Sequence, residues 1–382
     1  MSAPLVVVIG LGATGSAALY QLARRGVAAI GIEQFALGHE RGSSHGPTRI
    51  IRLAHFENAE YVPLMRRAYA LWHELESLAG IRLLHVNGIL EIGPPDAEIV
   101  RGTLAATQRH DLTPEILDAR TLMRRYPAFR LPHDWVGVLQ RDGGTVEARK
   151  AIETNISVAT KQSARVTVNE KVLAIEPRGN GVRVITGSNK IDADAAIVAG
   201  GPWMRSLVPE LAPLLRITRQ VTAWFAPEDA AQFAADRFPV FILESEFGNH
   251  YGLPAYESMG VKVAKHGHLQ ENVEPDGYQT TISAADEAAI RAPLTQYLPA
   301  ANGQMLSAET CLYTMTPDGT FIVDRMPGFP QIVIASPCSG HGFKFSPLVG
   351  EILADLATGG ATKIDIVQFR LQRFTAPQPA RA

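Results

Sequence analysis

Near its C-terminus the chain combines a single thiol with a positively charged side chain that could fix an anion. Cys311 lies in residues 310–314 (TCLYT), and Lys344 ends residues 339–344 (SGHGFK). A cysteine acts as a nucleophile in its thiolate form, and a lysine supplies a compact positive charge. The two glycines before Lys344 would let the backbone approach a flat ring closely. On their own, these residues are equally consistent with packing.

A second group of reactive side chains lies in residues 42–52 (GSSHGPTRIIR), which include His45, Thr48, Arg49 and Arg52. The glycine- and serine-rich turn runs into an apolar isoleucine pair, so we expect at least one arginine to be drawn into a site. The planar guanidinium group of arginine binds a carboxylate through two parallel hydrogen bonds. An isolated R-x-x-R pattern favours the alternative, a solvated surface loop.

The N-terminal segment predicts a dinucleotide site. Gly10, Gly12 and Gly15 satisfy G-x-G-x-x-G between an expected strand at 5–9 and an expected helix at 14–25, and Glu33 ends the next expected strand. The first two glycines permit a tight turn and close approach to a pyrophosphate, and the third lets helix and strand pack closely. The acid would accept from a ribose hydroxyl. This motif does not distinguish NAD from FAD.

The elements that must position these groups alternate between two types along the chain. Residues 5–33 predict a β-α-β unit, and 194–199 and 321–356 predict further pieces of the same domain. Residues 94–144 are broken by proline and glycine and predict loops and short strands, and 219–308 predict strands and turns. Further expected elements are helices at 61–78, 148–159 and 348–356, a hairpin at 181–191, and strands at 27–33, 85–92, 220–225, 240–243, 261–264, 321–324 and 332–335. Only the tail after Phe374 is expected to be disordered.

Composition excludes several classes of function. The chain has 382 residues, 46% of them hydrophobic and 19% charged, with a net charge of −2. It therefore has no global field that would concentrate it on nucleic acid or an anionic membrane. Two cysteines make no disulfide framework, and the start of the chain lacks a basic segment typical of a signal peptide. We expect a soluble, cytoplasmic monomer with no nucleic-acid or membrane partner and no metal.

In this order, these segments resemble the monomeric sarcosine oxidase family of flavin-dependent amine oxidases, with its N-methyltryptophan and pipecolate oxidase branches. The resemblance runs from Val6 to about Phe374. It implies an α/β fold, in which a Rossmann-like FAD-binding domain is interleaved with an α+β substrate domain built on a mixed sheet. The FAD-binding domain would comprise 1–84, 145–214 and 318–382, and the substrate domain 85–144 and 215–317.

The resemblance also implies individual roles. FAD would be carried by Cys311 through a thioether, and Lys262 would lie above the flavin ring, where a fixed charge assists oxygen reduction. His45 and Arg49 would line the ring. Arg52 and Lys344 would hold the substrate carboxylate, and Tyr251, Tyr313 and His266 would line the substrate pocket. The other expected FAD contacts are Gly10, Gly12, Ala13, Thr14, Gly15, Glu33, Ser43, Thr48, Val172, Gly200, Trp203, Gly340, Gly342, Phe343 and Lys344. Cys338 has no matching role, and we expect it to be structural.

The function implied is oxidation of a secondary amino acid, sarcosine or another N-methyl amino acid, with hydride passing to FAD and O2 reduced to hydrogen peroxide. A cyclic imino acid such as L-pipecolate is the alternative substrate, because Ser44 resembles the pipecolate branch. Pro47 and His55 also depart from the family pattern. Further alternatives are a flavin dehydrogenase with another acceptor, a catalytically inactive flavoprotein, and an NAD-dependent dehydrogenase.

Overall fold

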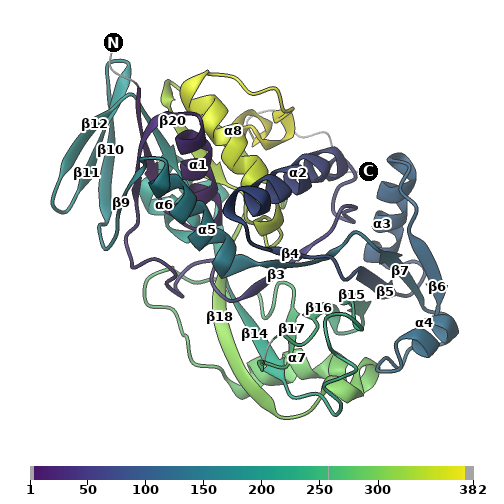
Figure 1. The fold of residues 1–382 in the computed structure, drawn as a ribbon. Coiled ribbons are helices and arrows are strands. Elements are labelled where there is room, and N and C mark those ends of the chain that lie inside the picture. The colour runs from purple at the N-terminus through teal and green to yellow at the C-terminus, as the bar shows by residue number, and fades with distance from the viewer. Residues whose placement is uncertain (1–3, 257, 375–382) are drawn as a thin grey trace.

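The computed structural model describes residues 4–256 and 258–374, and it confirms the α/β fold class. Two large sheets dominate it (Figure 1), one of six strands in the order β19-β20-β13-β1-β2-β9 and one of eight in the order β18-β14-β17-β16-β15-β5-β7-β6. Both sheets take their strands from several separate stretches of the chain. The domain boundaries given above remain a prediction.

The six-stranded sheet is parallel except for its edge strand β19, which runs antiparallel to β20. Short β-branched and alanine-rich runs form its centre, as expected for strands buried on both faces. Its strands are β1 (Leu5–Ile9), β2 (Ala28–Ile32), β9 (Arg165–Thr167), β13 (Ala195–Val198), β19 (Ile322–Met326) and β20 (Phe329–Ser336).

Four helices build the helical layer on this sheet (Figure 1): α1 (Ala13–Arg24), α2 (Tyr61–Ala79), α5 (Ala148–Lys161) and α8 (Ser346–Thr358). Helix α1 is central and packs against both α5 and α8. Small residues allow this close packing, since a Cβ atom on Gly350 of α8 would lie 2.6 Å from the backbone of Ala17. The start of α1 is thereby fixed relative to β1.

The other face of this sheet is covered by a three-stranded antiparallel sheet and by the short helix α6 (Met204–Leu207). The strands of the small sheet are β10 (Val172–Arg178), β11 (Gly181–Thr186) and β12 (Lys190–Ala193). Val182 and Val184 pack with Val7 and Ile9 of β1 in one core. Residues 187–189 form the turn predicted between β11 and β12.

The eight-stranded sheet is antiparallel except where β15 runs parallel to β5. Its strands are β5 (Ile89–Gly93), β6 (Glu115–Asp118), β7 (Val136–Gln140), β14 (Arg216–Phe225), β15 (Val240–Ser245), β16 (Gly248–Leu253), β17 (Val261–Lys265) and β18 (Met305–Met315). A small sheet of β3 (Thr48–Ile51), β8 (Gly144–Glu147) and β4 (Leu84–His85) lies between the two large ones (Figure 1).

Helix α7 (Ala284–Tyr297) packs on the eight-stranded sheet, and a buried ionic cluster holds its start. Ser283 and Asp286 form a capping box. Asp286 also accepts hydrogen bonds from Arg219 at 2.8 and 3.0 Å and contacts His268 at 2.8 Å. The arginine and the carboxylate are both buried. This cluster therefore ties β14, the segment after β17 and α7 together.

The sequence prediction was wrong about three helices. Helices α3 (Glu98–Arg109) and α4 (Ala119–Arg125) occupy a region expected to contain only loops and strands, and α7 was expected as strands and turns. Helix α3 buries Ile99, Val100 and Ala106 on one face, and α7 contains Pro293. The expected strand at 85–92 is divided between β4 and β5. The other expected elements are present with shifted ends, and the predicted disordered tail lies outside the described residues.

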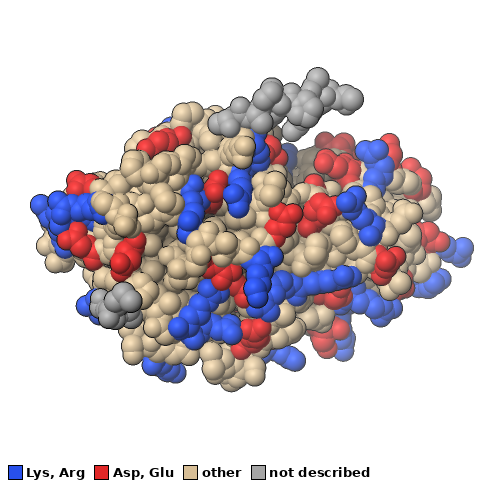
Figure 2. Space-filling view, turned by 90° about the horizontal axis from the view of Figure 1, so that it is seen from above, with Lys and Arg blue, Asp and Glu red and all other residues tan. Residues whose placement is uncertain are grey.

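Charge on the surface is mixed. Figure 2 shows basic and acidic side chains interspersed on the face seen from above, in keeping with the net charge of −2. No helix within 4–256 and 258–374 is long and apolar enough to cross a bilayer.

Candidate functional site

A pocket of about 440 Å³ lies between the glycine loop of the six-stranded sheet and one face of the eight-stranded sheet. Every predicted site residue except Gly15 lines it. The predicted residues brought together are Gly10, Gly12, Ala13, Thr14, Glu33, Ser43, His45, Thr48, Arg49, Arg52, Val172, Gly200, Trp203, Tyr251, Lys262, His266, Cys311, Tyr313, Gly340, Gly342, Phe343 and Lys344.

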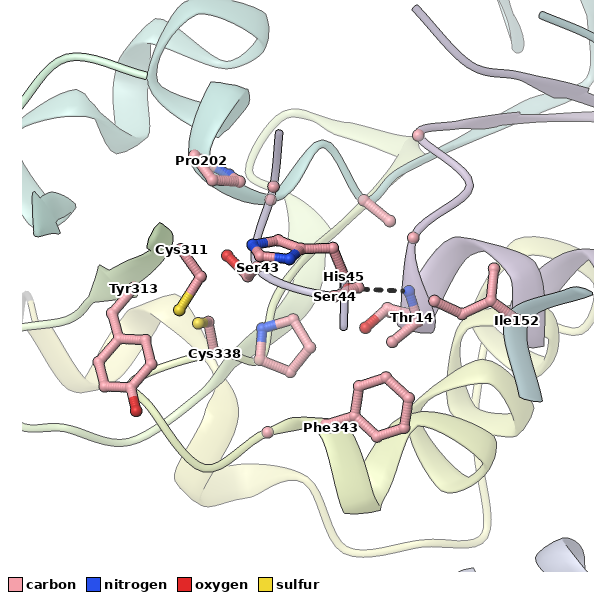
Figure 3. Close-up of a pocket in the computed structure, with 18 of the residues that line it drawn as sticks. Thr14, Ser43, Ser44, His45, Ile152, Pro202, Cys311, Tyr313, Cys338 and Phe343 are labelled. Carbon is pink, nitrogen blue, oxygen red and sulfur yellow. Dashed lines mark hydrogen bonds between the residues drawn. The ribbon is translucent and has the colours of Figure 1, made fainter. Parts of the chain in front are cut away.

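The glycine loop has the geometry expected for a phosphate cradle. Gly10 has a φ of +84°, and a Cβ atom there would lie 2.6 Å from the Ala199 carbonyl oxygen. Gly15 lies beneath the loop, where a Cβ atom would be 1.7 Å from the Gly10 carbonyl oxygen. Ala13 N donates to Ser44 Oγ at 3.2 Å, the dashed line in Figure 3. The start of α1 therefore faces the pocket, where its N-H groups and dipole favour an anion.

Glu33 is fixed by the loop it follows. Its carboxylate accepts from Leu11 N at 2.8 Å and Phe35 N at 3.2 Å, and His39 lies 3.4 Å away. Burial would raise the pKa of Glu33, but these hydrogen bonds lower it overall. Glu33 is thus a buried carboxylate that can accept further hydrogen bonds, such as one from a ribose hydroxyl.

One face of the eight-stranded sheet forms a wall of the pocket. Alternation along β18 places Glu309, Cys311 and Tyr313 on the same face. The neighbouring strands add further side chains to this face. Thr222 of β14 pairs with Glu309 of β18 on one side and with Ala264 of β17 on the other, and Ala264 in turn pairs with Tyr251 of β16. Each of these residues except Ala264 lines the pocket.

Lys262 points inward from this wall. It is 3% exposed, so its side chain does not extend into solvent. Its Nζ donates to the Thr48 carbonyl at 3.1 Å and lies 5.2 Å from the centre of the Trp224 ring. Burial, and next the Arg49 charge, lower the pKa of Lys262 to about 7. It is therefore a cation held in an apolar setting near another cation.

Arg49 shapes the turn that carries His45. It donates to the backbone carbonyls of Thr48 at 2.9 Å, Ser43 at 3.1 Å and His45 at 2.6 Å. Its guanidinium carbon lies 5.8 Å from the centre of the Phe343 ring. Within the described chain no carboxylate is at ion-pair distance from Arg49, so its positive charge is left for whatever occupies the pocket.

Both cysteines are free thiols, and both line the pocket. Burial raises the pKa of Cys311, and the charges of Arg49 and Lys262 oppose that shift. Cys338, which we expected to be structural, accepts a long contact from Thr314 N at 3.4 Å. Figure 3 shows both sulfur atoms on the same side of the cavity.

At the other end of the pocket Arg52 already has two carboxylate partners, which the predicted carboxylate clamp did not include. Its Nη1 donates to Glu91 at 2.5 Å, and its Nη2 donates to both oxygens of Glu57 at 2.6 Å. Lys344 donates to the His341 carbonyl at 2.8 Å. Burial, and next the Arg52 charge, lower the pKa of Lys344 to about 7.

The two carboxylates beside Arg52 are held differently. Glu91 is 0% exposed and accepts from Gln140 Nε2 at 2.8 Å, and Gln140 also accepts from Ala54 N. Glu57 has a side chain that is 25% exposed, lies outside the regular elements and lines the pocket. Although burial opposes it, the Arg52 charge holds the pKa of Glu57 well below its usual value. Of the two, Glu57 is therefore the more exposed and Glu91 the more firmly held.

Neutral histidines and tyrosines complete this end. Burial lowers the pKa of His266, and it lowers that of His341 to about 4. The rings of His266 and Tyr313 are 5.6 Å apart, and burial raises the pKa of Tyr251 to about 12. Near neutral pH these rings add no charge, so the positive charge at this end comes from Arg52 and Lys344.

Sequence reasoning missed the glutamates that lie beside the predicted cations and the thiol, among them Glu57, Glu91 and Glu309. The position of Glu309 two residues before Cys311 was a usable signal, because alternation along a strand places both on one face. The sequence contains no comparable signal for Glu57 and Glu91, because their roles depend on which segments of the folded chain meet Arg52.

The residues fit FAD. The pocket is continuous from Glu33, Val172 and Trp203 past the start of α1 to Cys311 and Lys344, so a nucleotide end, a phosphate cradle and a ring site follow one another. Within the described ranges, no group of three or more His, Cys, Asp or Glu side chains could hold a metal ion.

Comparisons with known proteins agree with this geometry. The FAD dependent oxidoreductase family (DAO) matches residues 6–356. The monomeric sarcosine oxidase of Streptomyces avermitilis is 36% identical, covering 97% of this chain and 98% of its own. The N-methyl-L-tryptophan oxidase of Salmonella typhimurium is 34% identical, covering 97% and 99%.

The fold is also similar to solved structures. The open form of NikD, described as an unusual amino acid oxidase essential for nikkomycin biosynthesis, has a TM-score of 0.85 and 25% identity, covering 97% of this chain and 98% of that one. The L-proline dehydrogenase of P. horikoshii has a TM-score of 0.83 at 21% identity, covering 98% of both chains, and shows the shared fold alone. The resemblance seen in the sequence is therefore confirmed, and the chain belongs to the FAD dependent oxidoreductase family.

Proposed function

We propose that this chain is an oxidase of a secondary amino acid, with sarcosine or another N-methyl amino acid as substrate and O2 as electron acceptor. FAD would take a hydride from the carbon next to nitrogen and return two electrons to O2, giving hydrogen peroxide. One observation carries the substrate class. Lys344 is a buried ammonium group that donates a hydrogen bond to the His341 backbone carbonyl, and it lies beside Arg52 at the pocket end lined by His266 and Tyr313.

The residues at this end would orient the substrate. A carboxylate would bind Lys344 and the Nη2 arm of Arg52 once Glu57 moves away, while Glu91 keeps the Nη1 arm in place. Phe56, Ile242 and Leu253 also line the pocket and would exclude water from the amine side. Holding a substrate in one orientation removes much of the entropic cost of reaction.

Residues at the ring site would assist the oxygen step. Lys262 and Arg49 present buried positive charge, and their closest partners are backbone carbonyls. Such preorganised charge stabilises an anion developing on oxygen. We infer from this that O2 is the acceptor, in preference to another electron carrier.

We also infer that FAD is attached covalently through Cys311, because that thiol lies on the pocket wall beside two cations. Acid precipitation should leave the yellow flavin in the protein pellet, and Cys311→Ser should release it to the supernatant. Release of intact FAD from the parent chain would show that the link is absent.

The reaction is tested by oxygen uptake and peroxide release from the purified holoprotein. We expect turnover with sarcosine or a larger N-methyl amino acid, and far less with an N-methylamine that lacks the carboxylate. L-pipecolate and L-proline distinguish a cyclic imino acid as the preferred substrate. Reduction of the flavin by substrate without oxygen uptake would instead identify a dehydrogenase.

A further inference from the structure

The guanidinium group of Arg52 is anchored by a residue that lies behind the pocket wall. Its Nη1 donates to Glu91 Oε1 at 2.5 Å, and its central carbon lies 4.6 Å from the centre of the Phe56 ring. Arg52 and Phe56 line the pocket, whereas Glu91 does not line it and is 0% exposed. Glu91 therefore holds the arginine from behind, out of contact with a substrate.

The place of Glu91 in the sheet is one where an apolar residue would be expected. On β5 it pairs with Val138 of β7 on one side and with Ile242 of β15 on the other, and both neighbours belong to a buried apolar cluster. A valine or leucine would complete this cluster, and exchange of a buried ionic group for a well-packed apolar one is often neutral or stabilising. Packing therefore gives no reason for an acid here, whereas contact with Arg52 does.

Gln140 fixes this carboxylate and also the segment that carries Arg52. It lies on β7, is 4% exposed, and donates through Nε2 to Glu91 Oε2 at 2.8 Å. The same amide pairs with the backbone of Ala54, where Ala54 N donates to its Oε1 at 2.8 Å and its Nε2 donates to the Ala54 carbonyl at 3.3 Å. One side chain thus ties both the backbone beside Arg52 and the partner of its guanidinium group to the sheet.

We propose that Gln140, acting through Glu91, is the residue that positions Arg52 for a substrate carboxylate. Because Nη1 is fixed, the Nη2 edge stays turned toward Glu57 and the pocket. A long side chain that becomes ordered only on binding weakens affinity, since binding must then offset its lost rotamer freedom. This inference rests on the proposed function, because the anion concerned is the carboxylate of the substrate.

The ion pairs of Arg52 explain why it needs such an anchor. It pairs with both Glu57 and Glu91, and in the proposed function Glu57 moves away when substrate binds. Without Glu91, the departure of Glu57 would leave the incoming anion to orient the guanidinium group by itself. With Glu91 held by Gln140, one ion pair persists in both states and only the partner of Nη2 changes.

The first test replaces the amide by an apolar side chain of similar size. Gln140→Leu leaves Arg52 and Lys344 in place, and the holoprotein is titrated with propionate at about pH 6 by calorimetry. We expect Kd to rise by about 3- to 10-fold, which corresponds to the ordering of one long side chain on binding. Gln140→Met, which is unbranched, should behave in the same way and serves if the leucine variant does not fold.

A matched control is the same substitution at another buried glutamine. Gln21 lies on α1, is 1% exposed and does not line the pocket. Gln21→Leu should leave the Kd of propionate unchanged. In an Arg52→Met background, Gln140→Leu should alter Kd by less than about twofold, because a residue that acts through Arg52 has no effect of its own on binding.

A kinetic measurement separates positioning from general damage to the site. Flavin reduction is followed without oxygen, using the best amino acid from the oxygen-uptake assay. Gln140→Leu should raise the apparent Kd of this substrate, as it does for propionate, and leave the limiting rate of reduction unchanged, because Arg52 is ordered once the carboxylate is bound. A limiting rate that falls as much as the affinity would show a distorted site and overturn the positioning role.

The binding results decide the proposal independently of turnover. An unchanged Kd of propionate in Gln140→Leu, or an equal rise in the parent and Arg52→Met backgrounds, would also overturn it. A parent chain that does not bind propionate would reject the proposed carboxylate site and the positioning role together. A parent chain that binds propionate but oxidises no amino acid would refute the proposed reaction alone, and Gln140→Leu would still decide whether Arg52 is positioned.

Discussion

Binding of a small carboxylate should weaken sharply as the pH rises above about 7, because it requires a protonated Lys344. Burial and the Arg52 charge place the pKa of Lys344 at about 7 in the free protein. An anion bound at Nζ stabilises the protonated form of Lys344, so the pKa of Lys344 is higher in the complex than in the free protein. Below pH 7 the ammonium form is already present and the affinity should be flat. Above it, the complex must take up one proton.

The size of the effect follows from linkage. Each pH unit above the pKa of the free lysine should raise Kd by about tenfold, or about 1.4 kcal/mol of binding free energy. From pH 7 to pH 9 propionate should therefore bind up to about 100-fold more weakly. Glu57 does not contribute to this change, since its lowered pKa keeps it ionised throughout the range. Propionate is likewise fully ionised, so the profile reports the protein.

The assay is calorimetric titration of the holoprotein with propionate at several pH values, in two buffers of different ionisation enthalpy. Proton uptake should rise from near zero to about one as the pH passes 7. Lys344→Met should bind propionate weakly and without this pH dependence, and propionamide should show no dependence in either protein.

Lys262 also has a pKa of about 7, so its variant is the necessary control. Lys262→Met should keep the pH profile of propionate binding. A parent Kd that is constant from pH 6 to 9, or a profile that disappears in Lys262→Met and persists in Lys344→Met, would refute the reasoning.

Three further perturbations test other parts of the structure. Lys262→Met should slow reoxidation of the reduced flavin by about 100-fold and should slow reduction of the oxidised flavin by substrate far less. Stopped-flow spectroscopy measures the two rates separately, and equal slowing of both would count against a role of Lys262 in the oxygen step. Glu57→Gln should tighten propionate binding by about 10-fold, because one charge-assisted competitor is removed; weaker binding in the same titration would show that Glu57 is not displaced. Asp286→Ala should cost about 3 kcal/mol or more in urea unfolding, since it leaves buried positive charge unpaired. Glu287→Ala, which breaks a partly buried pair with Arg291 on the same helix, should cost less, about 1 kcal/mol.

Local chemistry explains why the glycine loop could be predicted. Gly10 and Gly15 are required by a turn and by a contact between residues five apart, so their function is contained in a short stretch of sequence. The same holds for the strand alternation that puts Cys311 and Tyr313 on one face. Such patterns can be recognised in the sequence without knowledge of the tertiary structure.

The surroundings of Arg52 could not be predicted in this way. Its partner Glu91 comes from β5, a strand that joins the sheet between β15 and β7, and Gln140 comes from β7. The meeting of these side chains depends on sheet order, which hydrophobic periodicity does not encode. Helix α7 was missed for a related reason, because Pro293 weakens the helical pattern and the capping box at Ser283 is held by tertiary contacts of Asp286.

The two ends of the pocket differ in how their positive charge is balanced, and in the proposed function this difference would separate the two half-reactions. At the ring site, Arg49 and Lys262 donate hydrogen bonds to backbone carbonyls. These carbonyls carry no net charge and are fixed in the fold, so they do not neutralise the two cations, whether or not substrate is bound. At the substrate end Arg52 is neutralised by carboxylates until an anion displaces Glu57. In the proposed reaction, selection of a carboxylate would therefore depend on exchange of one ion pair for another, whereas the charge that assists oxygen would not depend on the substrate. An amine without a carboxylate would leave Glu57 in place and meet a narrower pocket, so the ion pair that stabilises the free protein also selects against that class of substrate.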